Sequence, residues 1–528
     1  MRPFLLGVPL LIIPQGTINT AAQLVPDLYV QVIPPQTYLI PGTQTNTIGI
    51  VGSAAWGPVN QPVIISDMPS YVRAFGAPVA RKGDMGTHVA TAVLQGANNF
   101  RCVRVTDGTD AAAQSTGVAG NITFAARYTG SLGNNLTVIL SAGSKANSWR
   151  AIIGVPGSQP EVFDNITGSG NAFWVNLARA INTGAGQLRG PSLLVIATAG
   201  GGTTTPSATT MTFSGGSDGG GVTSSHLVGV DTTTRSGIYA LRKQGCSIGV
   251  VADLDDSTKW TAVDALGITE GIYFIQCGPS GDTIANAVTT KQTAGLDSYA
   301  TKMMFGDWIV WYDPFSGINR LVSPQGFAAG RLANLSPEQS SLNKTMYGVI
   351  GTQRSNSTAA TYSSAELLVL EQAGIDVITN PGGGGLYIWT CRIGHNASSN
   401  QAVSGDWYTR MTNFIASSLD AGMGIYLGRP INRQLTLDVK ATLNSFFMGM
   451  LGQGLLGQSY DDGGNPWSVI CDIGPRTNNP PERVKLGFFQ VDCQIQFQAI
   501  NEKFIVNVEG GQTVTINRQT PSNGQIVT

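Results

Sequence analysis

Residues 45–67, TNTIGIVGSAAWGPVNQPVIISD, contain the turn that decides what kind of protein this is. The apolar run at residues 47–53 predicts a strand, and residues 63–66 predict a second strand soon after it. A loop that binds a dinucleotide has the glycine spacing G-x-G-x-x-G and leads into a helix. The glycines of GSAAWGP have a different spacing, and a strand follows them. The sequence therefore predicts a structural turn, with Trp56 packed against it.

Strands and helices alternate on both sides of this turn. Helices are predicted at residues 69–75 and 85–96, before a strand at residues 100–106. Buried strands are predicted again at residues 246–254 and 272–277. This order predicts an α/β unit with a largely parallel sheet. Further along, helices are predicted at residues 284–303, 365–373, 406–419 and 434–452, and strands at residues 308–312, 387–391 and 491–499.

The composition changes at about residue 108. Residues 108–225 are rich in Gly, Thr, Ser and Asn and contain short alternating strands, which predicts an all-β insertion. Within it, the run at residues 197–221 predicts a mobile loop. Because the α/β pattern returns from about residue 236, the α/β domain is predicted to be discontinuous.

The predicted fold is a multidomain α/β (α+β) protein with a discontinuous mixed-sheet core, an inserted all-β domain and extended N- and C-terminal β arms. The parts are an N-terminal arm at residues 1–25, an α/β domain made of residues 26–107 and 226–360, the β-rich insertion at residues 108–225, and a C-terminal α/β domain at residues 361–528 that ends in a β arm.

Charged residues are scarce in this 528-residue chain. They make up 12% of it, about half the usual share, and 31 basic residues balance 32 acidic ones. This balance gives no reason to expect nucleic acid or a membrane surface as a partner. Residues 1–72 carry only Arg2, Asp27 and Asp67 as charges. A surface so poor in charge is weakly protected against self-association, which favours a subunit of an assembly.

The N-terminal run MRPFLLGVPLLIIP allows two interpretations, a signal peptide or an arm that docks on a partner. It is too short to span a bilayer, and Pro9 and Pro14 interrupt it, which favours the arm. The six cysteines contain no C-x-x-C pair, which favours reduced thiols in a cytosolic protein.

Catalytic and metal-binding motifs are poorly supported. His88, His226 and His395 lie far apart without metal-ligand spacing, so we predict no metal site, no cofactor and no catalytic residue. The match of residues 215–219, GGSDG, to G-x-S-x-G lies in a Gly/Ser/Thr tract rather than between a strand and a helix. It is interpreted as a chance match.

Other stretches leave alternatives open. PGGGG at residues 381–385 and GPSGDTIANA at residues 278–287 could cradle an anion, although neither has the lysine of a phosphate loop. The acidic strand end at residues 253–256 could hold a cation or be solvated. The aromatic residues at 308–312 could form a ligand platform, or belong to a core or an interface.

The opening stretch carries a resemblance to a known family. PGTQTNTIGIVGSAAWGPVNQPVIISD followed by SYVRAFG at residues 70–76 resembles the N-terminal signature of tail sheath proteins of contractile phage tails and related injection machines. The residues that match its "G-x-A-x-x-G-P", "P-v-x-i-x-s" and "F-G" elements are Gly52, Ala54, Gly57, Pro58, Pro62, Phe75 and Gly76. Residues 100–105 resemble its following "x-v-R-V" strand, and ARYTGSLGNNLTVIL at residues 126–140 resembles the start of its insertion domain. Residues 410–457 resemble its inner domain.

The resemblance implies a structural protein of a virion tail, assembled in the host cytoplasm, and not an enzyme. In that family, subunits form stacked, hexameric rings around a tail tube, and contraction drives the tube through the host envelope. The implied partners are other copies of the chain, the tail tube protein, and the baseplate and tail terminator proteins, with no nucleic acid and no direct membrane insertion. Strand exchange uses main-chain hydrogen bonds, so it can tether subunits that rotate as bodies.

The resemblance also suggests which residues make contacts. The predicted inter-subunit arm strands are Leu28, Tyr29, Val30, Gln31 and Val32 at one end of the chain, and Phe504, Ile505, Val506, Asn507 and Val508 at the other. The candidates for facing the tube are Arg429, Arg433 and Lys440, a positive cluster that in the sequence is offset only by Asp438. Ordinary solvated helix charges are the alternative interpretation.

Two other functions are weighed against the sheath. A tail tube or baseplate protein belongs to the same assembly, but tube proteins are much shorter β-barrel chains. A β-rich hydrolase acting on a host surface polysaccharide would need a close carboxylate pair, which the sequence does not reveal.

Overall fold

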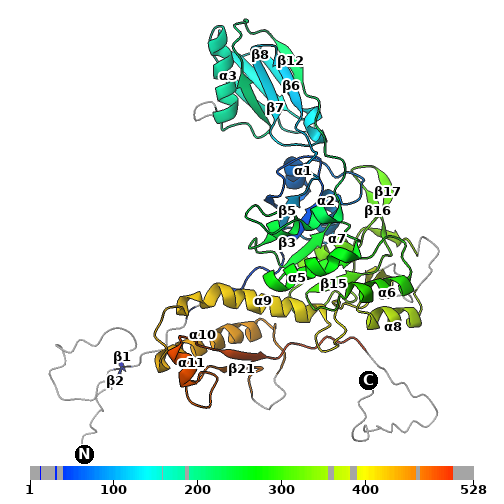
Figure 1. Cartoon of the computed structure of the whole chain (residues 1–528), viewed down its shortest axis with the longest axis vertical. Coiled ribbons are helices and arrows are strands. Elements are labelled where there is room, and N and C mark those ends of the chain that lie inside the picture. The colour runs from blue at the N-terminus through cyan, green and yellow to red at the C-terminus, as the bar shows by residue number, and fades with distance from the viewer. Residues whose placement is uncertain are drawn as a thin grey trace, which may run out of the picture. The chain divides into compact units, whose positions relative to one another are not determined.

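The computed structural model describes residues 38, 40–156, 158–184, 189–354, 362–380, 389–458 and 464–503, together with the backbone of residues 12–13 and 30–31 (Figure 1). Residues 1–498 form one compact unit, and Ala499–Thr528 form a second. Within the described residues, no helix is both long enough and apolar enough to cross a membrane.

A mixed sheet of six strands forms the centre of the first unit, in the order β15-β14-β13-β3-β5-β4. Its strands are β3 (Ile48–Gly52), β4 (Pro62–Ile65), β5 (Phe100–Arg104), β13 (Ile248–Val251), β14 (Tyr273–Cys277) and β15 (Thr301–Met304). All neighbours are parallel except β4 and β5. The predicted α/β class with a largely parallel sheet is confirmed. The strands that precede the insertion form one half of this sheet and those that follow it form the other half, and the two halves join where β3 pairs with β13.

Helices cover both faces of this sheet. Apolar residues of α1 (Met68–Phe75), α2 (Met85–Leu94) and α7 (Gln325–Ala333) pack with one face of the sheet, and those of α5 (Trp260–Glu270) pack with the other. The remaining helices of this part are α4 (Ser224–Val228), α6 (Ile284–Ala294) and α8 (Ser364–Gln372).

The prediction of one helix over residues 284–303 is wrong at its C-terminal end. Helix α6 ends at Ala294, where Gly295 adopts a left-handed conformation with φ 67°. Tyr299 and Ala300 then form a turn, and residues 301–304 form the buried strand β15. A glycine just after a helix is a common stop signal, because it takes this conformation without steric cost.

The inserted residues form two antiparallel sheets and a helix. The sheets have the orders β10-β9-β8-β12 and β11-β7-β6. The strands are β6 (Gln114–Val118), β7 (Ile122–Ala126), β8 (Thr137–Ala142), β9 (Trp149–Gly154), β10 (Glu161–Ile166), β11 (Val195–Ala199) and β12 (Thr209–Thr212). Helix α3 (Asn171–Thr183) contacts β10 and β11 (Figure 1).

The prediction of an all-β insertion is therefore wrong in one element. Phe173, Trp174, Leu177 and Ile181 are spaced as one face of a helix, and this face of α3 is buried against the strands. The prediction of a single loop over residues 197–221 is also wrong in part. The end of β11 and all of β12 lie within that run, and the Asp107 carboxylate accepts hydrogen bonds from the amides of Gly220 and Gly221.

A smaller sheet follows the central one, in the order β17-β16-β18. Its strands are β16 (Ile309–Asp313), β17 (Ile318–Val322) and β18 (Val349–Thr352), and a short pair is formed by β19 (Ile378–Thr379) and β20 (Thr390–Cys391). Trp308 and Trp311 are buried, and Tyr312 is 53% exposed. The two tryptophans are thus core residues rather than a ligand platform.

The C-terminal part has its own core. Its elements are α9 (Asp406–Met423), α10 (Arg433–Gly452), β21 (Trp467–Ile470), α11 (Pro481–Lys485) and β22 (Asp492–Ile495). Met411, Val439, Phe447 and Trp467 are buried there together. Near the N-terminus, β1 (Ile12–Ile13) pairs in parallel with β2 (Val30–Gln31) of the same chain.

Candidate assembly sites

The Gly-Pro corner after β3 is held by the buried guanidinium of Arg104. Its Nε donates to the carbonyl oxygen of Ala54 at 3.0 Å, and Nη1 donates to those of Gly57 at 2.8 Å and Thr129 at 2.9 Å. Burial lowers the pKa of Arg104. Because Thr129 belongs to the inserted residues, one side chain fixes both the corner and the start of the insertion. Arg104 is the arginine of the "x-v-R-V" strand, to which the sequence assigned no role.

Gly57 and Trp56 complete the corner. Gly57 has φ 100°, and a Cβ there would lie 2.6 Å from the carbonyl oxygen of Ala74. Trp56 is buried, and its ring meets that of Tyr128 edge-on at 5.5 Å between centroids. The corner is thus a structural turn, as the sequence predicted.

The carboxylates of the acidic strand end at residues 253–256 are bonded to other groups of the same chain. The Asp253 carboxylate lies 3.1 Å from Nε2 of buried His88, and Lys82 pairs with Asp255 at 2.7 Å. Asp256 caps the turn before α5. Although burial alone would raise it, the pKa of Asp253 is lowered, chiefly by His88. No group of three potential metal ligands occurs among the residues that the structure describes.

A buried ionic cluster joins the central sheet to α9, and no motif in the sequence indicated it. Lys302 Nζ on β15 lies 2.6 Å from Asp376 Oδ2 and 3.1 Å from Asp406 Oδ1, and all three side chains are fully buried. The hydroxyl of Tyr273 on β14 donates to Asp406 at 2.5 Å. Burial opposes ionisation of Asp406, but Lys302 lowers its pKa overall. The sequence pattern had placed Lys302 in a helix, where a lysine is unremarkable.

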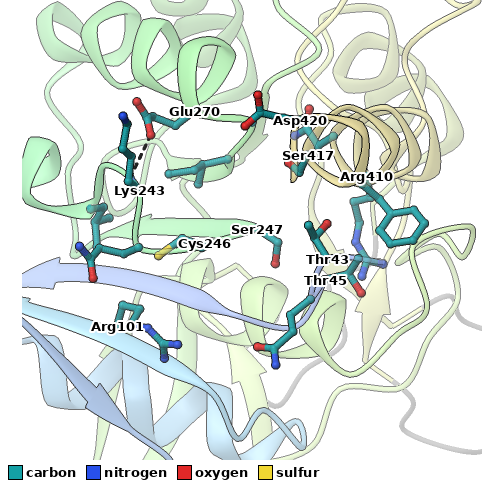
Figure 2. Close-up of a pocket in the computed structure, with 18 of the residues that line it drawn as sticks. Thr43, Thr45, Arg101, Lys243, Cys246, Ser247, Glu270, Arg410, Ser417 and Asp420 are labelled. Carbon is teal, nitrogen blue, oxygen red and sulfur yellow. Dashed lines mark hydrogen bonds between the residues drawn. The ribbon is translucent and has the colours of Figure 1, made fainter. Parts of the chain in front are cut away.

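A cavity of about 670 Å³ lies beside this junction. Figure 2 shows Thr43 and Thr45 facing α9, which contributes Arg410, Ser417 and Asp420. The backbone amide of Lys243 donates to Glu270 at 3.0 Å in its wall. Arg101 and Cys246 also line the cavity. Burial raises the pKa of the Cys246 thiol to about 12, so it is not a thiolate nucleophile.

The three candidates for facing the tube have different surroundings. Arg429 is stacked on Tyr38 and Tyr426, and Arg433 is the exposed first residue of α10. Lys440 Nζ pairs with Asp472 at 2.7 Å. In the sequence only Asp438 offsets this cluster, and tertiary folding adds Asp472, which reaches Lys440 from 32 residues away. Their contact with a tube stays a prediction.

Most of the predicted arm residues cannot be placed. Val30 and Gln31 form β2, whereas Leu28, Tyr29 and Val32 lie outside the described residues. So do Phe504, Ile505, Val506, Asn507 and Val508, and the PGGGG stretch at residues 381–385. The stretch at residues 278–287, for which an anion loop was one alternative, leads into α6, whose N-cap is Thr283, and Asp282 lies beside it. A carboxylate at that position disfavours an anion.

An exposed apolar face on α10 is a further candidate contact surface. Leu437, Met448 and Leu451 are 47%, 61% and 38% exposed, and their spacing of eleven and three residues places them on one side of the helix. Leu427, in the turn before α10, is 85% exposed. Exposed apolar groups that cluster in this way mark interaction surfaces.

Comparison with known proteins identifies the class of fold. No protein-family model and no curated protein matches the sequence. The chain has the fold of the sheath proteins of contractile tails and injection systems, as the resemblance in the sequence predicted.

Two solved sheath tail proteins and one injection-system sheath illustrate the likeness. The sheath tail protein of Desulfitobacterium hafniense is 14% identical, with a TM-score of 0.56 over 83% of this chain and 92% of its own. That of Listeria innocua is 12% identical, with a TM-score of 0.57 over 81% and 89%. The sheath of the PVC extracellular contractile injection system, in its contracted state, is 11% identical, with a TM-score of 0.52 over 92% and 97%. At these identities the likeness concerns the fold.

Proposed function

We propose that the chain is the subunit of a contractile tail sheath. It polymerises as stacked rings, of six copies each, around a tail tube, and its contraction drives the tube through a host envelope. The observation that carries this proposal is the extent of the shared fold, which covers 81–92% of this chain and 89–97% of three sheath chains. The low share of charged residues suits surfaces that neighbours cover.

The proposed partners are other copies of the chain, the tube protein, and the baseplate and terminator proteins of a virion tail, with assembly in the host cytoplasm. Copies are tethered by strand addition, in which residues 28–32 and 504–508 join sheets of neighbouring subunits. A contact with the tube would use Arg429, Arg433 and Lys440 or the apolar face of α10. Contraction uses contact energy stored in assembly, so the proposal requires no catalytic site.

The proposed domains follow the sheets. Residues 26–107 and 226–360 form the discontinuous α/β domain, and residues 108–225 form the insertion. Residues 361–528 form the inner domain and its arm. The membership of β3–β5 and β13–β15 in one sheet, with β6–β12 in two others, supports this division.

Electron microscopy of the purified chain at high concentration tests the proposal. Hollow cylinders with helical striations are the expected result. Deleting residues 1–25 or residues 504–528 should abolish the cylinders and leave the circular dichroism spectrum of a folded protein. Monomers at every salt and protein concentration, or normal cylinders from both truncated chains, would contradict it.

A further inference from the structure

A short segment before β3 crosses α9 and α10, and we call Tyr38 and residues 40–45 the strap. The backbone amide of Tyr38 donates to Thr442 Oγ1 on α10 at 3.2 Å. The amide of Thr43 donates to Ser418 Oγ on α9 at 3.1 Å. The two helices thus accept hydrogen bonds from backbone groups near both ends of the strap.

Apolar contacts fit the strap closely against α9. Ile40 is 5% exposed, and a Cβ at Gly422 would lie 2.8 Å from its Cγ2. A Cβ at Gly42 would lie 3.2 Å from the ring of Phe414. Glycine at 422 therefore permits an approach that a larger residue would obstruct.

Arg429 holds the outer end of the strap. Its guanidinium lies 5.3 Å from the ring centroid of Tyr38 and 5.2 Å from that of Tyr426, and Nη2 donates to the Tyr38 hydroxyl at 2.8 Å. The two tyrosine rings meet edge-on at 6.0 Å. The hydrogen bond to Tyr38 raises the pKa of Arg429, and Asp438 lies 3.7 Å away. A planar guanidinium that stacks and donates at once is a contact that lysine cannot reproduce.

The other side of the strap is open. Residues 42–45 line the cavity of Figure 2, and its lining also includes Lys243, Gly245 and Ser247. On this side, the Gln44 side chain accepts hydrogen bonds from Asn99 at 3.0 Å and from Thr47 at 3.4 Å. The hold on the strap therefore comes mainly from α9, α10 and Arg429.

We propose that the strap carries load between the N-terminal residues that precede it and helices α9 and α10, with Arg429 as the positioning residue that keeps it seated. This inference rests on the proposed function, in which those N-terminal residues tether a neighbouring copy. With the strap seated, tension from the neighbour passes to the inner helices. With the strap released, the same tension passes along the chain to β3 and the central sheet.

Amide hydrogen exchange on the monomeric full chain tests whether Arg429 keeps the strap on α9 and α10. In Arg429→Ala, the amides of Tyr38 and Thr43 should exchange at least tenfold faster than in the wild type. Tyr38→Phe, which removes only the hydroxyl acceptor, and Arg429→Lys, which keeps the charge but loses the stacked plane, should give smaller increases. The matched control is Arg354→Ala, which removes a guanidinium stacked on Tyr362 at 4.3 Å and paired with Glu366, and it should leave both amides unchanged.

Cylinder formation tests the load-bearing role. Arg429→Ala should reduce the yield of cylinders at least fivefold at a concentration where the wild type and Arg354→Ala assemble fully, with the melting temperature unchanged. Unchanged exchange at Thr43, or faster exchange with a full yield of cylinders, would overturn the role of the strap. Failure of the wild-type chain itself to form cylinders would overturn the proposed function instead, while the exchange rates still decide whether Arg429 seats the strap.

Discussion

Helices α9 and α10 are attached to the central sheet at two places of opposite character. At the first, Lys302, Asp376 and Asp406 form a fully buried ionic cluster at the N-terminus of α9. At the second, the strap is held by a half-buried stack of Arg429 on two tyrosines. A buried cluster is costly to break because each separated charge stays out of water, whereas a surface contact opens and closes readily. The first attachment is thus built to stay fixed and the second to be releasable.

Removing a charge from the buried cluster should have the largest effect. Asp406→Asn should lower the free energy of unfolding by about 3 kcal/mol, because Lys302 and nearby Arg410 lose a buried counter-charge. Urea unfolding followed by circular dichroism measures this effect. Asp472→Asn breaks the exposed pair with Lys440 and should cost less than about 1 kcal/mol. Equal losses in the two variants would show that the buried cluster is no costlier to break than an exposed ion pair.

The corner should be nearly as sensitive as the cluster. Arg104→Met should cost about 2–3 kcal/mol, because the carbonyl groups of Ala54, Gly57 and Thr129 lose a charged donor in a buried place. The same unfolding measurement applies. A variant as stable as the wild type would show that Arg104 does not fix the corner.

Substitutions at Gly57 and at a second glycine can separate the cost of a steric clash from the cost of an unfavourable backbone conformation. Gly57→Ala should cost about 2 kcal/mol or more, because φ 100° is unfavourable for alanine and the new Cβ meets the carbonyl oxygen of Ala74. Gly215→Ala is the matched control, with φ 83° and no atom within 4 Å of the new Cβ, and should cost only about 1 kcal/mol. The difference in melting temperature between the two variants isolates the close approach, and equal melting temperatures would refute it.

Acid should weaken the buried attachment. The pKa of Asp406 is lowered in the folded chain, so its ion pair contributes stability above the unfolded-state pKa, near pH 4. This contribution is lost as the pH falls below about 4 and through the folded-state pKa. The free energy of unfolding of the wild type should therefore fall over this range more steeply than that of Asp406→Asn. Parallel curves would show that Asp406 does not titrate with unfolding.

Much of the fold could be predicted from residues 45–106, because the signals there are local. Apolar runs with capping residues set β3, α1, α2 and β5, and the spacing of the two glycines excluded a dinucleotide loop. The prediction was wrong where two patterns overlapped. The helical face of α3 lay within a tract rich in strand and turn residues, and the β15 lysine continued the pattern of the preceding helix.

By itself, the sequence determined the α/β class, the structural corner and the resemblance to sheath proteins, since these depend on local periodicity and on the order of short motifs. Tertiary structure alone decided the contacts between residues far apart in the chain. Lys302 meets Asp406 over 104 residues, and Arg429 meets Tyr38 over 391. Lys440 and Asp472 likewise form an ion pair over 32 residues. Charge partners of this kind are set by how helices and strands pack, and packing leaves no periodic trace along the chain.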